Sequence, residues 1–117
     1  MKECDNLNES SFNSPILKCG QLIIDLKCRK VTIADKKINL STREFNLLYF
    51  LVKHPGWVFT YDELYRFVWG EEPVNCKNSV MCCISQVRKK IELNSRYPKY
   101  IHTVRDVGYK FELLPED

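Results

Sequence analysis

The stretch that most constrains how this chain can fold is residues 78–92, NSVMCCISQVRKKIE. Its apolar residues recur at intervals of four, three and four positions, which places them on one face of an α-helix. These residues are Val80, Ile84, Val87 and Ile91. The opposite face is polar and consists of Asn78, Cys82, Ser85, Gln86 and Lys89. By itself the pattern also fits an ordinary amphipathic surface helix, so its role depends on the rest of the chain.

Positive charge is concentrated around this helix. The chain of 117 residues has a net charge of only +3, which does not indicate a nucleic-acid partner on its own. Between Lys77 and Lys110, eight basic residues stand against Glu92 and Asp106, so this segment carries +6 and the remainder −3. A basic segment on an otherwise mildly acidic domain is consistent with a domain that binds a polyanion through one side. It is almost equally consistent with a charged surface that only contacts solvent.

Length and composition favour one domain in a reducing compartment. A chain of this size with 44% hydrophobic residues can bury a stable core without help from disulfide bonds or metal ions. Its six cysteines form no CxxC pair, and the polar N-terminus does not resemble a signal peptide. No apolar run approaches the roughly 18 residues that span a bilayer. We therefore expect a cytoplasmic protein with free thiols, no membrane segment and no metal. The alternative is a zinc site combining Cys76, Cys82 or Cys83 with His102.

Short runs of β-branched residues precede the first helix. Residues 21–25, 29–33 and 36–40 are bounded by turn-forming residues such as Gly20 and Asp35. Because each run is close to the usual strand length of about five residues, the sequence predicts a small antiparallel sheet of three or four strands.

A capping box, Ser41-Thr42-Arg43-Glu44, marks the start of a helix. The Ser41 hydroxyl can accept a free backbone amide of the first turn while Glu44 reaches back to the cap. The following residues are apolar on nearly every side, so this should be the central buried helix. It should end at Pro55-Gly56, followed by a short extended link at residues 57–59.

A second capping box, at residues 60–63, opens a helix that runs through Val68 and Trp69 and stops at Gly70. A polar loop, residues 71–77, then leads into the helix at 78–92. Two helices in this order, with the exposed polar face on the second, have the arrangement of a helix-turn-helix with a longer connection.

The chain closes with a predicted β-hairpin. Residues 100–104 and 109–113 are its strands and residues 105–108 its turn, so that Arg105 stands at the tip. Pro115 ends the fold. We expect one domain at residues 16–115, preceded by a flexible tail or linker at residues 1–15.

Three segments, taken together and in this order, resemble one family. They are LSTREFNLLYFLVKHPGWVFTYDELYRFVWGE at residues 40–71, the helix at 78–92, and PKYIHTVRDVGYKFE at residues 98–112. They are similar to the winged-helix DNA-binding domain of the OmpR/PhoB type, the output half of many bacterial two-component response regulators. The resemblance implies an α+β winged helix-turn-helix with a four-stranded N-terminal antiparallel sheet, three helices and a C-terminal β-hairpin wing.

The resemblance also implies roles in DNA binding. The positions that face base edges in the major groove are Cys82 and Gln86. The positions near phosphates are Trp69, Asn78, Cys83, Ser85 and Arg88, with Lys89 on the same polar face. In the wing, Thr103 and Tyr109 touch the backbone and Arg105 reaches into the minor groove.

Two kinds of protein partner are implied in the same way. The loop that this family often presents to RNA polymerase corresponds to Glu71, Glu72, Pro73, Val74, Asn75, Cys76 and Lys77. Two copies in this family commonly bind direct repeats on double-stranded DNA as a head-to-tail dimer. No cofactor is implied.

The chemistry of these side chains agrees with most of these roles. Gln86 can bond an adenine through N6 and N7, and Cys82 offers an apolar contact to a thymine methyl group. Arg105 suits a narrow, A·T-rich minor groove, whose potential is more negative. Many relatives, however, have consecutive arginines where this chain has Ser85 and Gln86, which predicts a shallower salt dependence of binding. Asp106 replaces the usual wing glycine and can adopt the left-handed conformation.

The sequence is also compatible with other interpretations. Trp69 could pack on the core with its indole N–H at the rim. Cys82 could sense redox state if its thiol were acidified beside Arg88 and Lys89. No motif of an enzyme is present, so we expect none. The main prediction is a sequence-specific transcription regulator, either the output domain of a response regulator or a stand-alone protein. The alternative is a winged-helix protein-interaction module with weak or no DNA binding.

Overall fold

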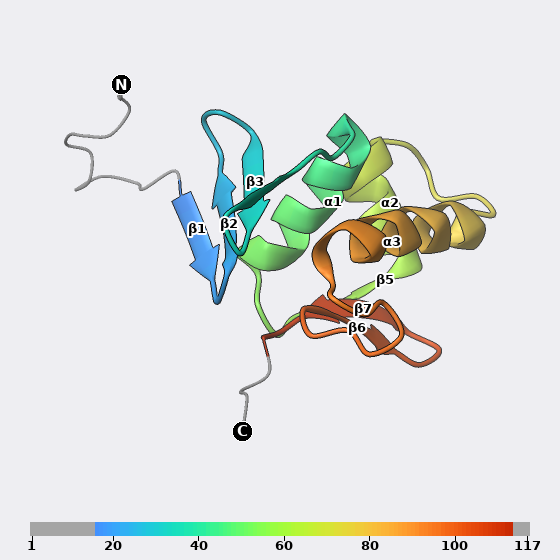
Figure 1. Ribbon diagram of the computed structural model, residues 1–117. Helices are drawn as coiled ribbons and strands as arrows, with labels where there is room; N and C mark the ends of the chain where they lie inside the picture. Colours follow the sequence, from blue (N-terminus) through green and yellow to red (C-terminus); the bar gives the residue numbers. More distant parts are fainter. Residues whose placement is uncertain (1–15, 114–117) are drawn as a thin grey trace.

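The computed structural model describes residues 16–113, so the predictions for the tail at 1–15 and for Pro115 lie outside the described part. Ten elements follow in order: β1 (Ile16–Cys19), β2 (Leu22–Asp25), β3 (Lys30–Ile33), β4 (Lys36–Ile38), α1 (Thr42–Lys53), β5 (Val58–Thr60), α2 (Tyr61–Trp69), α3 (Lys77–Ile91), β6 (Ile101–Val104) and β7 (Gly108–Phe111). The N-terminal sheet lies at one end and the small C-terminal sheet beneath the helices (Figure 1). The α+β winged helix-turn-helix predicted from the sequence is confirmed.

The N-terminal sheet has four antiparallel strands in the order β1-β2-β3-β4. The three runs of β-branched residues correspond to β2, β3 and β4, and β1 supplies the fourth strand that the family resemblance implied. Leu22, Ile24 and Val31 are buried and join the sheet to the core. The turn between β3 and β4 places Ala34 and Asp35 at φ 49 and φ 68, so it is a left-handed turn.

Both capping boxes form as predicted. In α1 the Ser41 hydroxyl accepts from the Glu44 amide at 3.1 Å, and the Glu44 carboxylate accepts from the Ser41 amide at 3.0 Å. Thr60 and Glu63 repeat the pattern at the start of α2. Gly70 ends α2 in the left-handed conformation at φ 71, which costs glycine little because it lacks a Cβ.

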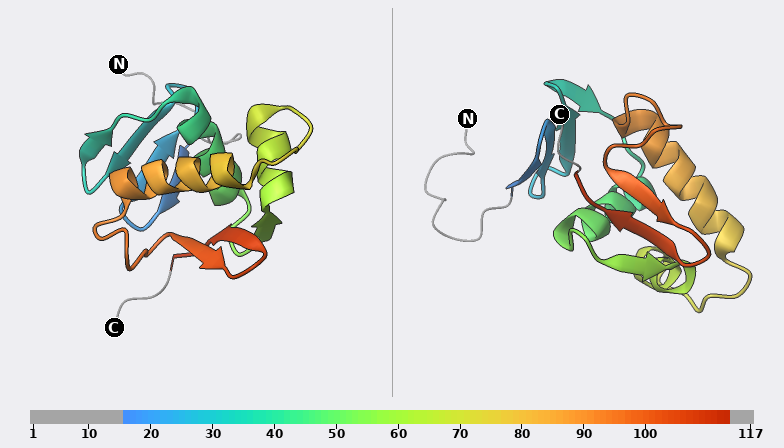
Figure 2. Two further views of the ribbon diagram at one scale, coloured as in Figure 1. Left: turned by 90° about the vertical axis from the view of Figure 1, so that its right-hand side faces the viewer. Right: turned by 90° about the horizontal axis from the view of Figure 1, so that it is seen from below.

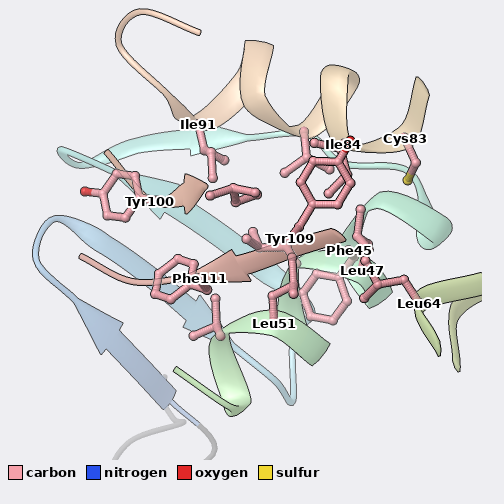
Figure 3. Close-up of a cluster of buried hydrophobic side chains, with 14 of the residues drawn as sticks. Phe45, Leu47, Leu51, Leu64, Cys83, Ile84, Ile91, Tyr100, Tyr109 and Phe111 are labelled. Carbon is pink, nitrogen blue, oxygen red and sulfur yellow. The ribbon is translucent and has the colours of Figure 1, made fainter. Parts of the chain in front are cut away.

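The hydrophobic core lies where α1 meets α3 and the C-terminal sheet. Leu47, Leu48 and Leu51 of α1 are fully buried. The four apolar residues that the periodicity of residues 78–92 singled out are also buried. Figure 3 shows two of them, Ile84 and Ile91, pointing from α3 into the core. Burial of each large aliphatic side chain contributes about 1.5–3 kcal/mol, so this contact fixes the orientation of α3.

The C-terminal sheet corrects one prediction. Residues 57–59 were expected to be a simple link, yet Val58–Thr60 is strand β5, which pairs antiparallel with β7 in a sheet of order β5-β7-β6. Gly108 permits this pairing, because a Cβ at that position would collide with the Phe59 carbonyl oxygen. Since β5 pairs with β7 and runs directly into α2, the hairpin is connected to α2 as well as to α3.

Glu92, directly after α3, anchors the return of the chain into β6. Its carboxylate is buried and accepts the backbone amides of Lys99, Tyr100 and Ile101 at 2.6, 3.0 and 2.9 Å. Such charge-assisted bonds are about twice as strong as neutral ones. The end of α3 and the start of the hairpin are thereby held in one fixed relation.

Glu92→Ala should lower the free energy of unfolding by about 2–3 kcal/mol, because three amides lose an ionised acceptor. Urea denaturation measures the change. The control is Glu72→Ala, which removes an exposed carboxylate whose ion pair with Arg66 is open to solvent and should cost less than about 1 kcal/mol. Equal losses in the two variants would contradict the anchoring role of Glu92.

Candidate nucleic-acid interface

The polar face of α3 is open to solvent. Asn78, Cys82, Ser85, Gln86 and Lys89 are all exposed, while the apolar face of the same helix is buried. In the left view of Figure 2, α3 runs across the front of the molecule, with the β6–β7 hairpin below it. The hairpin does not cover the polar face. The amphipathic pattern in the sequence is therefore confirmed, and five polar side chains form a continuous accessible surface.

A groove of about 650 Å³ opens beside this face. Its walls are the first turn of α1, the end of α2 and the near side of α3. Cys82 and Gln86, predicted to face bases, line it together with Trp69 and Arg43. The groove therefore joins the exposed side of α3 to two other elements.

Trp69, at the end of α2, packs against the core and also lines the groove. Its half-buried ring packs against the core, stacks on Tyr65 with ring centroids 4.9 Å apart, and still lines the groove. The Arg43 guanidinium carbon lies over the ring, 4.8 Å from its centroid. Core packing and access to the groove are compatible in this geometry.

The two adjacent cysteines of α3 differ sharply in environment. Cys82 is exposed, whereas Cys83 is only 8% exposed and belongs to the core, with its sulfur on the inner side of α3 (Figure 3). Burial, with a smaller contribution from the nearby Glu44 charge, raises the pKa of Cys83 to about 11. The implied contact of Cys83 with a phosphate is corrected by this burial, because the thiol is turned toward α1.

Arg88 joins α3 to the wing. Its Nε and Nη2 donate to the Ile101 carbonyl at 3.2 and 2.9 Å, and Nη2 also donates to the Thr103 hydroxyl at 2.9 Å. Burial lowers the pKa of Arg88, although the side chain stays cationic at neutral pH. Among residues 16–113 no hydrogen bond is made by Nη1, which leaves that end available to an anion. The family resemblance implied that Arg88 and Thr103 each contact the DNA backbone, and in the structure they also contact each other.

Tyr109 is also more buried than its implied contact with the DNA backbone requires. It is 4% exposed, and its ring meets Tyr61 edge to face at 5.6 Å. Burial and the neighbouring Tyr61 raise the pKa of Tyr109 to about 12. The Arg88 guanidinium lies 5.4 Å from the same ring. The environment corrects the expected role: Tyr109 packs the hairpin against α2 and α3, and little of it can reach a phosphate.

The tip of the wing is exposed as predicted. Arg105, Asp106 and Val107 are all open to solvent. Asp106 adopts φ 65, the left-handed conformation that the sequence analysis allowed for this aspartate. The tip keeps its turn without glycine and holds one cation beside one anion.

The loop between α2 and α3 is held at both ends. Glu71 accepts from the Tyr65 hydroxyl at 3.2 Å, and Glu72 pairs with Arg66. Cys76 is buried and its thiol donates to the Asp62 carboxylate at 3.4 Å; burial followed by this bond raises the pKa of Cys76. The burial corrects the inclusion of Cys76 in a surface that contacts polymerase. The middle of the loop is accessible, and Val74 is 71% exposed.

The described part of the chain, residues 16–113, brings together no group of three histidine, cysteine or carboxylate side chains that could hold a metal ion. It also contains no helix with the length and apolar character needed to cross a bilayer.

The fold and the exposed helix define a winged helix-turn-helix domain, and comparison with known proteins identifies its family. Residues 35–111 match the family model described as "Transcriptional regulatory protein, C terminal". The chain belongs to this family, the C-terminal DNA-binding domains of the OmpR/PhoB type.

Individual relatives agree with this assignment. The transcriptional regulatory protein YkoG of Bacillus subtilis is 38% identical over 96 residues, covering 80% of this chain and 40% of YkoG. The phosphate regulon regulator PhoB of Rhizobium meliloti is 33% identical over 99 residues, covering 85% of this chain and 43% of PhoB. The chain spans about half the length of the curated relatives it matches.

Among solved structures, the Klebsiella pneumoniae RstA DNA-binding domain, crystallised with the RstA box, superposes with a TM-score of 0.77 at 34% identity. The match covers 83% of this chain and 96% of that one. The Thermotoga maritima OmpR/PhoB homologue DrrB gives the same TM-score at 33% identity, covering 84% of this chain and 44% of DrrB.

Arg88→Ala should loosen the wing, because three hydrogen bonds to β6 are lost. Amide hydrogen exchange of β6 and β7 should accelerate while that of α1 stays unchanged, and stability should fall by about 1.5–3 kcal/mol. Lys89→Ala, at the exposed neighbouring position, is the control and should leave both quantities unchanged. Unaltered exchange in the hairpin of the Arg88 variant would refute this coupling.

Proposed function

We propose that this chain binds double-stranded DNA sequence-specifically, as the output domain of a transcription regulator. In this proposal α3 enters the major groove and the β6–β7 hairpin enters the adjacent minor groove. The observation that carries it is the polar face of α3, which is accessible along its length while its apolar face is locked in the core. The similar RstA domain was crystallised in complex with its own DNA box, which supports double-stranded DNA as the partner.

The side chains of α3 divide by chemistry into two groups. Gln86 and Cys82 read bases, because an amide pairs with adenine and a small apolar group accepts a thymine methyl. Asn78, Ser85 and Lys89 contact phosphates, which fix the register without carrying sequence information. The exposure of all five supports these assignments.

The wing contributes through its tip. Arg105 is exposed at the turn and enters an A·T-rich minor groove, where the negative potential is strongest. Arg88 and Thr103 hold β6 at a set distance from α3, and Nη1 of Arg88 adds a contact to the backbone between the two grooves. Both grooves are therefore approached by one rigid unit.

Gln86→Ala should cost about 1–3 kcal/mol on the preferred duplex and relax the preference at one base position, because a bidentate contact to adenine is lost. Fluorescence anisotropy measures this with a duplex selected from a random pool and with single-base variants of that duplex. The matched control is Gln21→Ala, an exposed glutamine in the N-terminal sheet region.

Three outcomes of this titration are informative. Saturable binding with two copies on a direct repeat and one on a single site supports the proposal together with a head-to-tail dimer. Unchanged affinity and preference in the Gln86 variant would remove Gln86 as a base reader. If the unsubstituted domain bound no duplex at low salt, the proposal would fail in favour of a protein-interaction module.

Within the same proposal, the loop between α2 and α3 contacts RNA polymerase in the cytoplasm. Its middle projects from the domain, while hydrogen bonds of Glu71 and Cys76 hold its ends. A loop with fixed ends and an exposed apolar centre suits a second macromolecule when α3 is occupied by DNA.

Val74→Ser should weaken recruitment of purified bacterial RNA polymerase to the protein–DNA complex by about fivefold, because one lost valine contact costs roughly 1 kcal/mol. Affinity for DNA alone should not change. Leu93→Ser, which alters an exposed leucine after α3, is the control. Equal recruitment by the Val74 variant and the unsubstituted protein would argue against this role of the loop.

A further inference from the structure

We propose that Arg43, in the first turn of α1, binds a DNA phosphate and so adds a cation from α1 to those that α3 provides. This inference rests on the proposed function, since it concerns the same complex. It adds to the interface a residue of a helix outside the helix-turn-helix pair.

Arg43 shares a groove with the proposed base readers. The same hollow is lined by Arg43, Cys82 and Gln86, so a duplex seated on these two residues of α3 passes the guanidinium. The first turn of α1 and the end of α2 lie side by side next to α3 (Figure 1). With α3 in the major groove, the phosphates along the edge of that groove would therefore lie next to Arg43 and Trp69.

The Arg43 side chain is held without using its donors. Its guanidinium lies over the Trp69 ring, and that ring is stacked on Tyr65 at an interplanar angle of 14°. Among residues 16–113 Arg43 forms neither a hydrogen bond nor an ion pair. A cation–π contact fixes the plane of the guanidinium while leaving its N–H groups along the edge, where they can meet a phosphate.

The charge near Arg43 also favours an anion. The carboxylate lining the groove, Glu44, is paired with Lys90 at 2.7 Å and accepts the Ser41 amide at 3.0 Å. Although burial acts to raise the pKa of Glu44, these bonds and the Lys90 charge hold it below its ordinary value. The negative charge of Glu44 is thus balanced by Lys90. The positive end of the α1 dipole adds to the charge of Arg43.

This arrangement predicts a contact that is independent of sequence. Arg43→Gln removes the charge but keeps a planar polar group over Trp69. It should reduce the magnitude of the slope of log K against log salt by about 0.9, which is roughly an eightfold loss of affinity at about 0.1 M salt. The loss should be equal on the duplex selected from a random pool and on an unrelated duplex of the same length.

Two further variants sharpen the test. Arg43→Lys keeps the charge and should retain the salt slope of the unsubstituted protein. Arg66→Gln removes an exposed arginine of α2 that pairs with Glu72 and does not line the groove, so its slope should also be unchanged. Thermal unfolding of each variant, followed by circular dichroism, checks that the fold is retained.

The outcomes separate this inference from the proposed function. If the unsubstituted domain binds and Arg43→Gln keeps its salt slope, the phosphate contact is refuted while DNA binding stands. A loss confined to one duplex would likewise overturn it, because a phosphate contact cannot discriminate sequence. If the unsubstituted domain binds neither duplex, the proposed function falls and the contact falls with it.

Discussion

The apolar face of α3 packs on α1, and the orientation of every exposed group on α3 follows from that contact. Val80, Ile84 and Val87 are buried against the leucines of α1, so the helix cannot rotate about its axis without exposing them. A rotation that exposed even one aliphatic side chain would cost about 1.5–3 kcal/mol. The polar face is therefore presented to solvent in one orientation, as a surface that reads DNA requires.

Polar contacts extend this constraint to the wing. Glu92 fixes the point where the chain enters β6, and Arg88 binds the same strand further along, at Ile101 and Thr103. Strand β5 pairs with β7 of the hairpin and continues directly into α2, so it links the hairpin to α2. The hairpin is thus tied to both helices of the helix-turn-helix. Two grooves of a duplex can then be met at a fixed spacing, with little ordering cost on binding.

The sequence predicted the elements of this fold better than their mutual contacts. Periodicity and capping boxes located the helices because these signals are local. Strand β5 was missed because three residues carry no pattern, and its existence depends on Gly108 far along the chain. Cys83 and Arg88 lie on the flanks of α3, where spacing alone cannot tell inward from outward. Their directions were decided by α1 and β6, which no local pattern encodes.

The distribution of cations bears on how this interface could discriminate between sequences. On the polar face of α3, Lys89 is cationic while Ser85 and Gln86 are neutral, and Arg43 adds a proposed phosphate contact from α1. Phosphate contacts strengthen binding to all DNA alike, whereas base contacts raise only specific affinity. A reading helix with few cations therefore keeps general affinity low without weakening the contacts of Gln86. Because genomic DNA competes through general affinity, the ratio between the two, rather than either alone, sets occupancy of a site.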